Sequence, residues 1–389
     1  MAKNEHSPPV SADVPLVVGS LGHRPELDGI RGLAILLVFL VHFRFRTTGN
    51  VIDSAVDQLF RAGWMGVDLF FVLSGLLITG VLLETKSSKR YFRNFYVRRV
   101  LRLFPVYYGM LAILFIVLPR VLSPAPAELL ALTPHQGWYW TYTVNVFQVL
   151  TLDRIDYFNT LHLWSLSVEE QFYLIWPFAV WWLSPRWLLR VSVVAVLAAV
   201  GFRILSASQG NDWAAYVLVP ARMDALAIGA LIAVLARDST GSALIRRWWR
   251  RLALISAGTI GAIAIAQSGY REDEYLVLTA GFLVNAVLAA ATIGGLLAEP
   301  RSGVHRPFHW RWLQWVGQRS YGAYVYHLPL LLIVGPVKDL FRGLPPIAGS
   351  RLPAEVAWIL GMACLTMAVA EASFRWLERP FLALKPRFT

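Results

Sequence analysis

The chain has 389 residues, of which 57% are hydrophobic and only 15% are charged, and its mean hydropathy is +0.53. A soluble domain usually carries about 25% charged residues, so this composition excludes a soluble globular protein and indicates that most of the chain lies in lipid. The net charge of +12 does not indicate nucleic-acid binding, because the basic residues cluster between apolar segments, as in membrane proteins that follow the positive-inside rule.

The first residues of the chain precede all of the apolar segments. They lack the basic start, apolar stretch and small-residue cleavage site that a signal peptide carries in that order, so we expect residues 1–23 to form a disordered cytoplasmic tail. The single cysteine, Cys364, lies in an apolar run and is interpreted as a packing residue, since one cysteine allows no intramolecular disulfide.

Eleven apolar segments are candidates for membrane spans, because a spanning helix needs about 20 mostly apolar residues. In chain order they are 30–45, 64–83, 101–118, 138–150, 168–184, 187–205, 223–236, 252–267, 276–297, 321–337 and 355–374. The weakest is 138–150, which is short and contains Asn145 and Gln148.

The basic loops decide whether this weak segment spans. Lys and Arg are concentrated in 86–102, 237–251, 298–320 and the C-terminus, which are therefore assigned to the cytoplasm. If both termini are cytoplasmic, the span before 138–150 ends outside the cell and the span after it begins outside. Both directions are possible only if 138–150 itself does not cross the membrane. The sequence therefore predicts an all-α, polytopic membrane bundle of about ten transmembrane helices. Its membrane domain covers 24–383 and includes an outer-face segment at 119–167, and a short cytoplasmic tail follows at 384–389.

The first span carries two polar residues, Arg31 and His42. Eleven residues of helix place them on one stripe, about 16 Å apart along the axis. A charge near the bilayer centre costs roughly 2.5–3.5 kcal/mol on insertion scales, so both residues are candidates for function. The alternative is that Arg31 is a topological anchor and His42 a histidine with a structural interhelical hydrogen bond.

Three carboxylates are predicted to share the outer layer with His42. Asp68 could orient its imidazole or pair with Arg61. Glu169 and Glu170 are predicted at the outer entrance of their helix, where acidic residues are often only partners of the helix dipole. Together with His42 these residues form a candidate acid–base cluster.

The third span begins with a basic cluster, Arg98, Arg99 and Arg102. Guanidinium groups suit polyphosphate recognition, although basic residues at a helix end are often interfacial anchors.

Further polar residues receive structural interpretations. We expect a structural hydrogen bond for His327, on the cytoplasmic side, and an ion pair between Arg222 and Asp224. The sequence contains no GxGxxG after a strand, no P-loop, no HExxH, no CxxC and no GxSxG, so neither a metal nor a nucleotide fold is expected.

Six sequence motifs carry a family resemblance. They are LDGIRGLAILLVFLVH, GVDLFFVLSGLLITG, RRVLRLFPVYY, HLWSLSVEEQFYLIWP, SYGAYVYHLP and LERPF. In this order they resemble acyltransferase family 3, integral-membrane O-acyltransferases that modify bacterial envelope glycans, nodulation oligosaccharides and macrolides. The resemblance extends over residues 24–383.

The resemblance implies an acyl-CoA donor, above all acetyl-CoA, taken from the cytoplasm, and a hydroxyl acceptor. The arginine–histidine signature of the family falls on Arg31 and His42, and His42 is expected to act as a general base or transient acyl carrier. The family's arginine cluster and glutamate pair fall on Arg98, Arg99, Arg102, Glu169 and Glu170. The distance of roughly 16 Å along the first helix is comparable to the extended pantetheine arm, so the arginines would hold the phosphates while the thioester reaches His42.

Several alternatives stay open at this point. We expect a protein of the bacterial inner membrane, in contact with lipids, whose acceptor is an envelope glycan or glycolipid. A small glycosylated natural product such as a macrolide is the second candidate. A non-catalytic exporter or flippase is the third, although the internal repeats common in transporters are not found. Because the chain ends soon after LERPF, we expect no role that requires the fused extracytoplasmic esterase-like domain of some family members.

Overall fold

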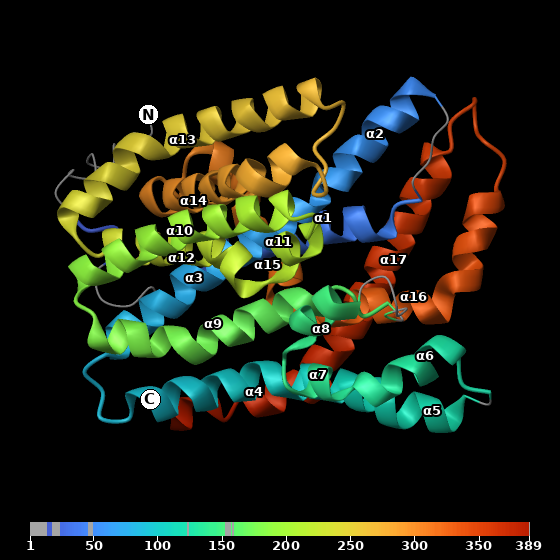
Figure 1. Ribbon diagram of the computed structural model, residues 1–389, viewed down its shortest axis with the longest axis horizontal. Coiled ribbons are helices and arrows are strands. Elements are labelled where there is room, and N and C mark those ends of the chain that lie inside the picture. The colour runs from blue at the N-terminus through green and yellow to red at the C-terminus, as the bar shows by residue number, and fades with distance from the viewer. Residues whose placement is uncertain are drawn as a thin grey trace, which may run out of the picture.

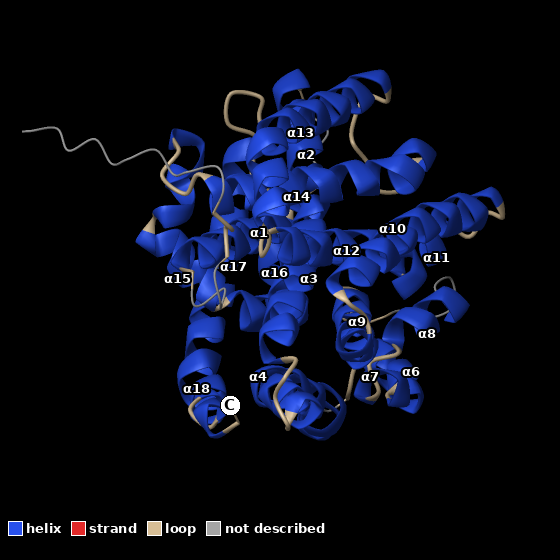
Figure 2. Ribbon diagram, turned by 90° about the vertical axis from the view of Figure 1, so that its left-hand side faces the viewer, coloured by secondary structure: helices blue, strands red, loops and turns tan. Residues whose placement is uncertain are grey.

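The computed structural model describes residues 14–17, 24–45, 50–122, 124–151, 157 and 159–388. These residues form helices and loops, and no strand occurs among them (Figure 2), which confirms the all-α prediction. Most of the tail predicted at 1–23 falls outside the described residues. The long helices are α1 (Pro25–Phe43), α3 (Met65–Thr85), α4 (Tyr91–Ala112), α9 (Leu163–Trp182), α10 (Pro185–Ser208), α12 (Val219–Leu235), α13 (Ser239–Ala266), α14 (Phe282–Ala298), α16 (Ser320–Gly343) and α17 (Leu352–Ser373).

Seven helical stretches of the described chain are long and apolar enough to cross a membrane, or eight if the two halves of α16 count as one span. These halves, Ser320–Gly335 and Val337–Gly343, meet at an angle of 71°. At 1.5 Å per residue, α1 and α9 are also about 30 Å long, but both carry charged residues along their length. The multi-pass helical bundle is thus confirmed, whereas the count of ten spans stays a prediction.

The segment 138–150 contains no long helix. It holds α7 (Gly137–Trp140) and most of α8 (Val144–Thr151), and eight helical residues extend only about 12 Å. The other short helices are α2 (Val51–Arg61), α5 (Leu118–Val121), α6 (Ala127–Leu132), α11 (Asp212–Val217), α15 (Arg311–Gln318) and α18 (Arg379–Leu382). Short π-helical turns extend α4 at Ile113–Val117, precede α14 at Val277–Gly281 and follow α17 at Phe374–Glu378.

The two ends of the bundle are defined by contacts between helix ends and loops that are distant in sequence. At one end, Lys86 donates to the Leu183 carbonyl at 2.6 Å and Arg237 to that of Gly80 at 2.7 Å. At the opposite end, Arg61 pairs with Asp273 at 3.1 Å. The basic loops therefore gather at one end, in the alternation predicted from the sequence. Which end faces the cytoplasm stays a prediction.

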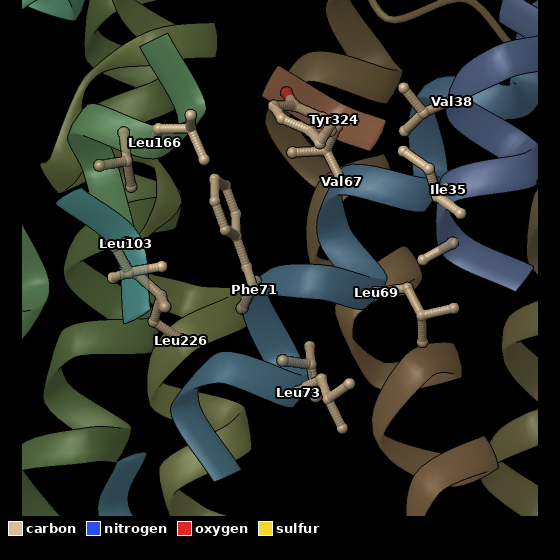
Figure 3. Packing of buried hydrophobic residues seen from close by; sticks show 14 of the residues in the cluster. Ile35, Val38, Val67, Leu69, Phe71, Leu73, Leu103, Leu166, Leu226 and Tyr324 are labelled. Carbon is tan, nitrogen blue, oxygen red and sulfur yellow. The ribbon is translucent and has the colours of Figure 1, made fainter. Parts of the chain in front are cut away.

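Helix α3 lies at the centre of the bundle, while α13 and α4 form opposite edges (Figures 1 and 2). Because α3 is apolar around most of its circumference, it is buried on all sides. Figure 3 shows its side chains between those of α1 on one side and those of α4, α9 and α12 on the other. Gly75 of α3 and Gly229 of α12 face each other's backbone so closely that a Cβ atom on either would overlap a carbonyl oxygen. These glycines allow the central pair of helices to pack in direct contact.

Candidate active site

A cavity lies between α1, α3, α4, α9 and α16. It encloses about 690 Å³, counting the solvent in its open mouth. Apolar walls come mainly from α3. Its polar lining consists of Arg31, Ser74, Arg99, Arg102, Ser165, Glu169, Tyr173, Ser320, Tyr321 and Tyr324.

One part of the cavity wall is cationic. Arg31 projects from the second turn of α1, where Asp28 pairs with it at 3.0 Å. Arg99 and Arg102 are three residues apart on α4 and therefore share one face of that helix. The structure thus brings together three of the four predicted arginines. Arg98 is not part of the lining, because it lies on a different side of α4.

The C-terminal segment adds a cation that sequence reasoning missed. Lys385 lies within electrostatic reach of Arg31 and of all three α4 arginines. The segment is held against the start of α4, where the guanidinium of Arg93 lies 5.5 Å from the Phe388 ring centroid. Residues of the predicted tail 384–389 therefore border the basic cluster.

Glu169 lines the same cavity as these arginines. Its carboxylate accepts a hydrogen bond from the Ser74 hydroxyl at 2.6 Å, whereas Glu170 is not part of the lining. The prediction that both glutamates stand at the outer entrance of their helix is wrong, because α9 begins at Leu163 and Glu169 therefore lies about 9 Å inside it. The glutamate faces the cationic wall instead of the imidazole of His42.

Three histidines meet behind the cavity wall, and none of them is part of its lining. His42 Nδ1 lies 3.2 Å from Nε2 of His327, and the rings of His327 and His162 are 4.7 Å apart between centroids. The described residues contain no group of His, Cys, Asp or Glu arranged to hold a metal ion. The three imidazoles therefore form a row of packed rings, and no metal centre is indicated there.

Two of these histidines were misjudged or missed from the sequence. His327 makes the predicted structural hydrogen bond, to the Tyr324 carbonyl at 2.6 Å, but it also contacts His42. His162 was not singled out, although it directly precedes α9 and is only 2% exposed. Its signal in the sequence is a polar residue beside the apolar start of a membrane helix.

Tyr324 and Ser165 separate the cavity from the three histidines. Both residues line the cavity, and their hydroxyl groups are hydrogen-bonded at 2.6 Å. The Tyr324 ring lies 5.3 Å from that of His327 and 5.4 Å from that of His162. Tyr324 thus borders the cavity on one side and the imidazoles of His327 and His162 on the other.

Asp68 is held away from His42 by a different network. Its carboxylate pairs with Arg222 of α12 and accepts from the Asn285 amide at 3.1 Å. The two partners predicted for Asp68, His42 and Arg61, are therefore wrong. The predicted ion pair between Arg222 and Asp224 is also wrong, because Asp224 pairs with Arg203 at 2.7 Å. Because α12 packs tightly on α3, Arg222 reaches the buried carboxylate of Asp68, although the two residues are far apart in the sequence.

Comparison with known proteins shows which family the chain is similar to. A family model described as an acyltransferase domain matches residues 24–372. The chain is 29% identical over 372 residues to the peptidoglycan O-acetyltransferase OatA of Listeria monocytogenes, covering 92% of this chain and 55% of that protein. It is 24% identical over 379 residues to the O-acetyltransferase OatA of Staphylococcus aureus, covering 92% of this chain and 57% of the relative.

The chain thus spans about half the length of these relatives. No solved structure matches. The family match covers nearly the whole membrane bundle, including every helix that lines the cavity. This chain therefore belongs to acyltransferase family 3.

Proposed function

We propose that this protein is a membrane O-acyltransferase that moves an acetyl group from cytoplasmic acetyl-CoA to a hydroxyl of a peptidoglycan-type envelope glycan. The observation that carries the proposal is the cavity, which has arginines on one wall and is bordered on another side by Tyr324, whose ring packs against His327 and His162. The acceptor class rests on the names of the relatives, which describe peptidoglycan O-acetylation.

The residues of the cavity fit a phosphorylated donor. Arg31, Arg99 and Arg102 present guanidinium forks, which suit bidentate binding of phosphate oxygens, and Lys385 lies within electrostatic reach of them. Glu169 limits the repulsion among these cations while the site is empty of phosphate. Acetyl-CoA supplies an activated thioester carbonyl, and the apolar wall of α3 suits the uncharged part of its arm.

His42 acts as the general base in this proposal. It takes the proton of the acceptor hydroxyl while the new ester C–O bond forms and the thioester C–S bond breaks, and it returns that proton to the leaving sulfur. Arg31 and His42 stand about 16 Å apart on α1. The charged donor can therefore remain near the basic end of the bundle while its acyl group reaches the imidazole.

The test is transfer by the purified chain in liposomes. With radiolabelled acetyl-CoA and a soluble peptidoglycan fragment, we expect an alkali-labile acetyl ester on the glycan, identified by mass spectrometry. If a macrolide is acetylated and the glycan is not, the proposed acceptor is wrong and a glycosylated natural product takes its place in the proposal. Movement of either molecule across the membrane without ester formation would contradict an enzyme and favour an exporter.

A further inference from the structure

The positions of the ring protons on His42 and His327 follow from three contacts. Nδ1 of His42 lies 3.0 Å from the Val38 carbonyl oxygen and 3.2 Å from Nε2 of His327. Nδ1 of His327 lies 2.6 Å from the Tyr324 carbonyl oxygen. A carbonyl oxygen only accepts hydrogen bonds, and a neutral imidazole carries one proton. The contacts therefore determine the tautomer of each ring in turn.

His327 must carry its proton on Nδ1. At 2.6 Å from the Tyr324 carbonyl, an unprotonated nitrogen would direct its lone pair at the lone pairs of the oxygen. The ring is fully buried, and within the described part of the chain no carboxylate makes a hydrogen bond or ion pair with it. A second proton would thus create an unpaired buried charge, which is costly. Neutral His327 therefore presents a lone pair at Nε2.

The tautomer of His42 follows from the two groups beside its Nδ1 atom. Both groups next to its Nδ1, the Val38 carbonyl and the His327 Nε2 lone pair, are acceptors. Nδ1 of His42 must donate, so its lone pair lies on Nε2. Among the described residues this Nε2 atom has no hydrogen-bond partner, yet it is not one of the buried unpartnered atoms. It therefore faces accessible space, where a substrate hydroxyl can approach.

We propose that His327 is a positioning residue, which together with the Val38 carbonyl holds His42 in the orientation and tautomer that present Nε2 as the proton acceptor. This inference rests on the proposed function, in which His42 is the general base. When Nε2 takes the hydroxyl proton, Nδ1–H of the resulting imidazolium donates to Nε2 of His327, which shares the positive charge. A neutral imidazole thus takes the place that a carboxylate holds in the Ser-His-Asp triad.

A proline in α16 explains how the His327 ring is held. Pro329 has no backbone N–H, so the Val325 carbonyl lacks its helical donor. His162 replaces that donor, with Nε2 3.3 Å from the Val325 oxygen. In this position the His162 ring packs edge-on against His327, at an interplanar angle of 72°. Phe39 of α1 lies 6.1 Å from His327 between ring centroids. These contacts restrict the rotation of the His327 ring.

The first test measures the tautomer directly and requires no activity. The full-length chain, labelled with ¹⁵N in its eight histidines, is examined by NMR in liposomes at neutral pH, and the His42 signals are identified by their loss in His42→Ala. We expect a protonated Nδ1 and an unprotonated Nε2 for His42. A proton on Nε2 would overturn the inference, whatever the protein catalyses.

The second test separates positioning from packing. His327→Leu removes the acceptor, whereas His327→Gln supplies an amide oxygen at a similar reach. We expect His327→Leu to lower kcat on the order of 10–100-fold, the effect of losing one hydrogen bond to a charged group. The KM for acetyl-CoA should change less than about two-fold, because an interaction specific to the transition state acts on kcat. His327→Gln should regain most of this loss. His305→Leu is the matched control, since His305 is also buried and contacts the Glu299 carbonyl at 2.9 Å.

The positioning role would be refuted if the kcat of His327→Leu lies within about two-fold of the wild-type value. This comparison requires monodisperse protein with unchanged thermal unfolding. If His327→Leu is not monodisperse, His327→Asn replaces it, because its shorter amide cannot reach His42. A rate of His327→Asn equal to that of His327→Gln would then be the refuting result. Absence of acetyl transfer in the wild type would refute the proposed function, while the NMR result would still decide the tautomer.

Discussion

Single charged residues inside this bundle are compensated by partners from other helices. Asp68 pairs with Arg222, and Asp224 pairs with Arg203 at 2.7 Å. All four side chains are almost fully buried, as expected where an unpaired charge in lipid is costly. His42 is different, because no carboxylate of the described chain bonds to it. A neutral, half-buried imidazole with a free nitrogen is suited to accept a proton.

The role of His42 is tested most simply by its removal. His42→Ala should reduce acetyl transfer to background, because general base catalysis contributes roughly 10²–10⁴-fold, while insertion of the first helix should not suffer from the loss of a polar group. Acetyl ester formation by purified protein is the measurement. His309→Ala, at an exposed histidine, serves as control. Full turnover by a monodisperse His42→Ala protein would remove His42 from the reaction.

The arginines of α4 offer an internal comparison. Arg99→Gln and Arg102→Gln should each raise the KM for acetyl-CoA by roughly 10-fold or more, since a hydrogen bond to a charged group contributes about 1.5–3 kcal/mol. Arg98→Gln removes the same charge from the same helix but from outside the cavity lining. It should change the KM less than about three-fold. An unchanged KM for all three substitutions would show that these residues act only as membrane anchors.

Sequence reasoning identified residues better than it identified their partners. Arg31 and His42 were recognisable because helix periodicity places residues eleven apart on one stripe. The contact of His42 with His327 depends on how α1 and α16 pack, which no local pattern reveals. His162 became visible only through the Val325 carbonyl that Pro329 leaves without a donor.

At the scale of helices, small residues determine how closely the central elements pack. Helices α3 and α12 meet at Gly75 and Gly229, where backbone lies against backbone. Gly75 therefore permits the direct contact of α3 with α12. The extent of α9 was predicted less well, because a start at residue 168 was inferred from hydropathy and the helix begins at Leu163. A shift of five residues was enough to place Glu169 at the wrong depth.

Substitution of Gly75 should therefore be more harmful than that of an exposed helical glycine. Gly75→Ala forces a methyl group against the Leu226 carbonyl and should cost about 1–3 kcal/mol, the usual range for overpacking. Gly258→Ala on α13 meets no atom within 4 Å and should be neutral or stabilising, since alanine favours helix. Thermal unfolding in detergent compares the two. An unchanged unfolding temperature for Gly75→Ala would contradict the packing described for α3 and α12.

At the scale of the whole molecule, the basic loops share one end of the bundle with the cationic wall of the cavity. This arrangement suits a donor that comes from the cytoplasm. The alternation of helix ends was predictable because charge in short loops correlates with sidedness. The cavity itself was not predictable, since its walls come from five helices distributed along the chain.

Cysteine labelling tests the orientation. In a Cys364→Ala background, Ser208→Cys at the end of α10 should react in intact cells with a membrane-impermeant thiol reagent. Ser87→Cys, in the basic loop before α4, should react only after permeabilisation. Both serines are exposed. The reverse pattern of labelling would invert the bundle and place the arginine wall at the outer surface.

The central claim is that the acyl group reaches an outer acceptor from a donor that stays on the cytoplasmic side. It is tested most directly in liposomes containing the purified chain, with acetyl-CoA supplied only at the face that carries the basic loops and the soluble peptidoglycan fragment only at the opposite face. We predict acetylated glycan under these conditions and none with His42→Ala. Product formed only when both substrates are on the same face would contradict the account.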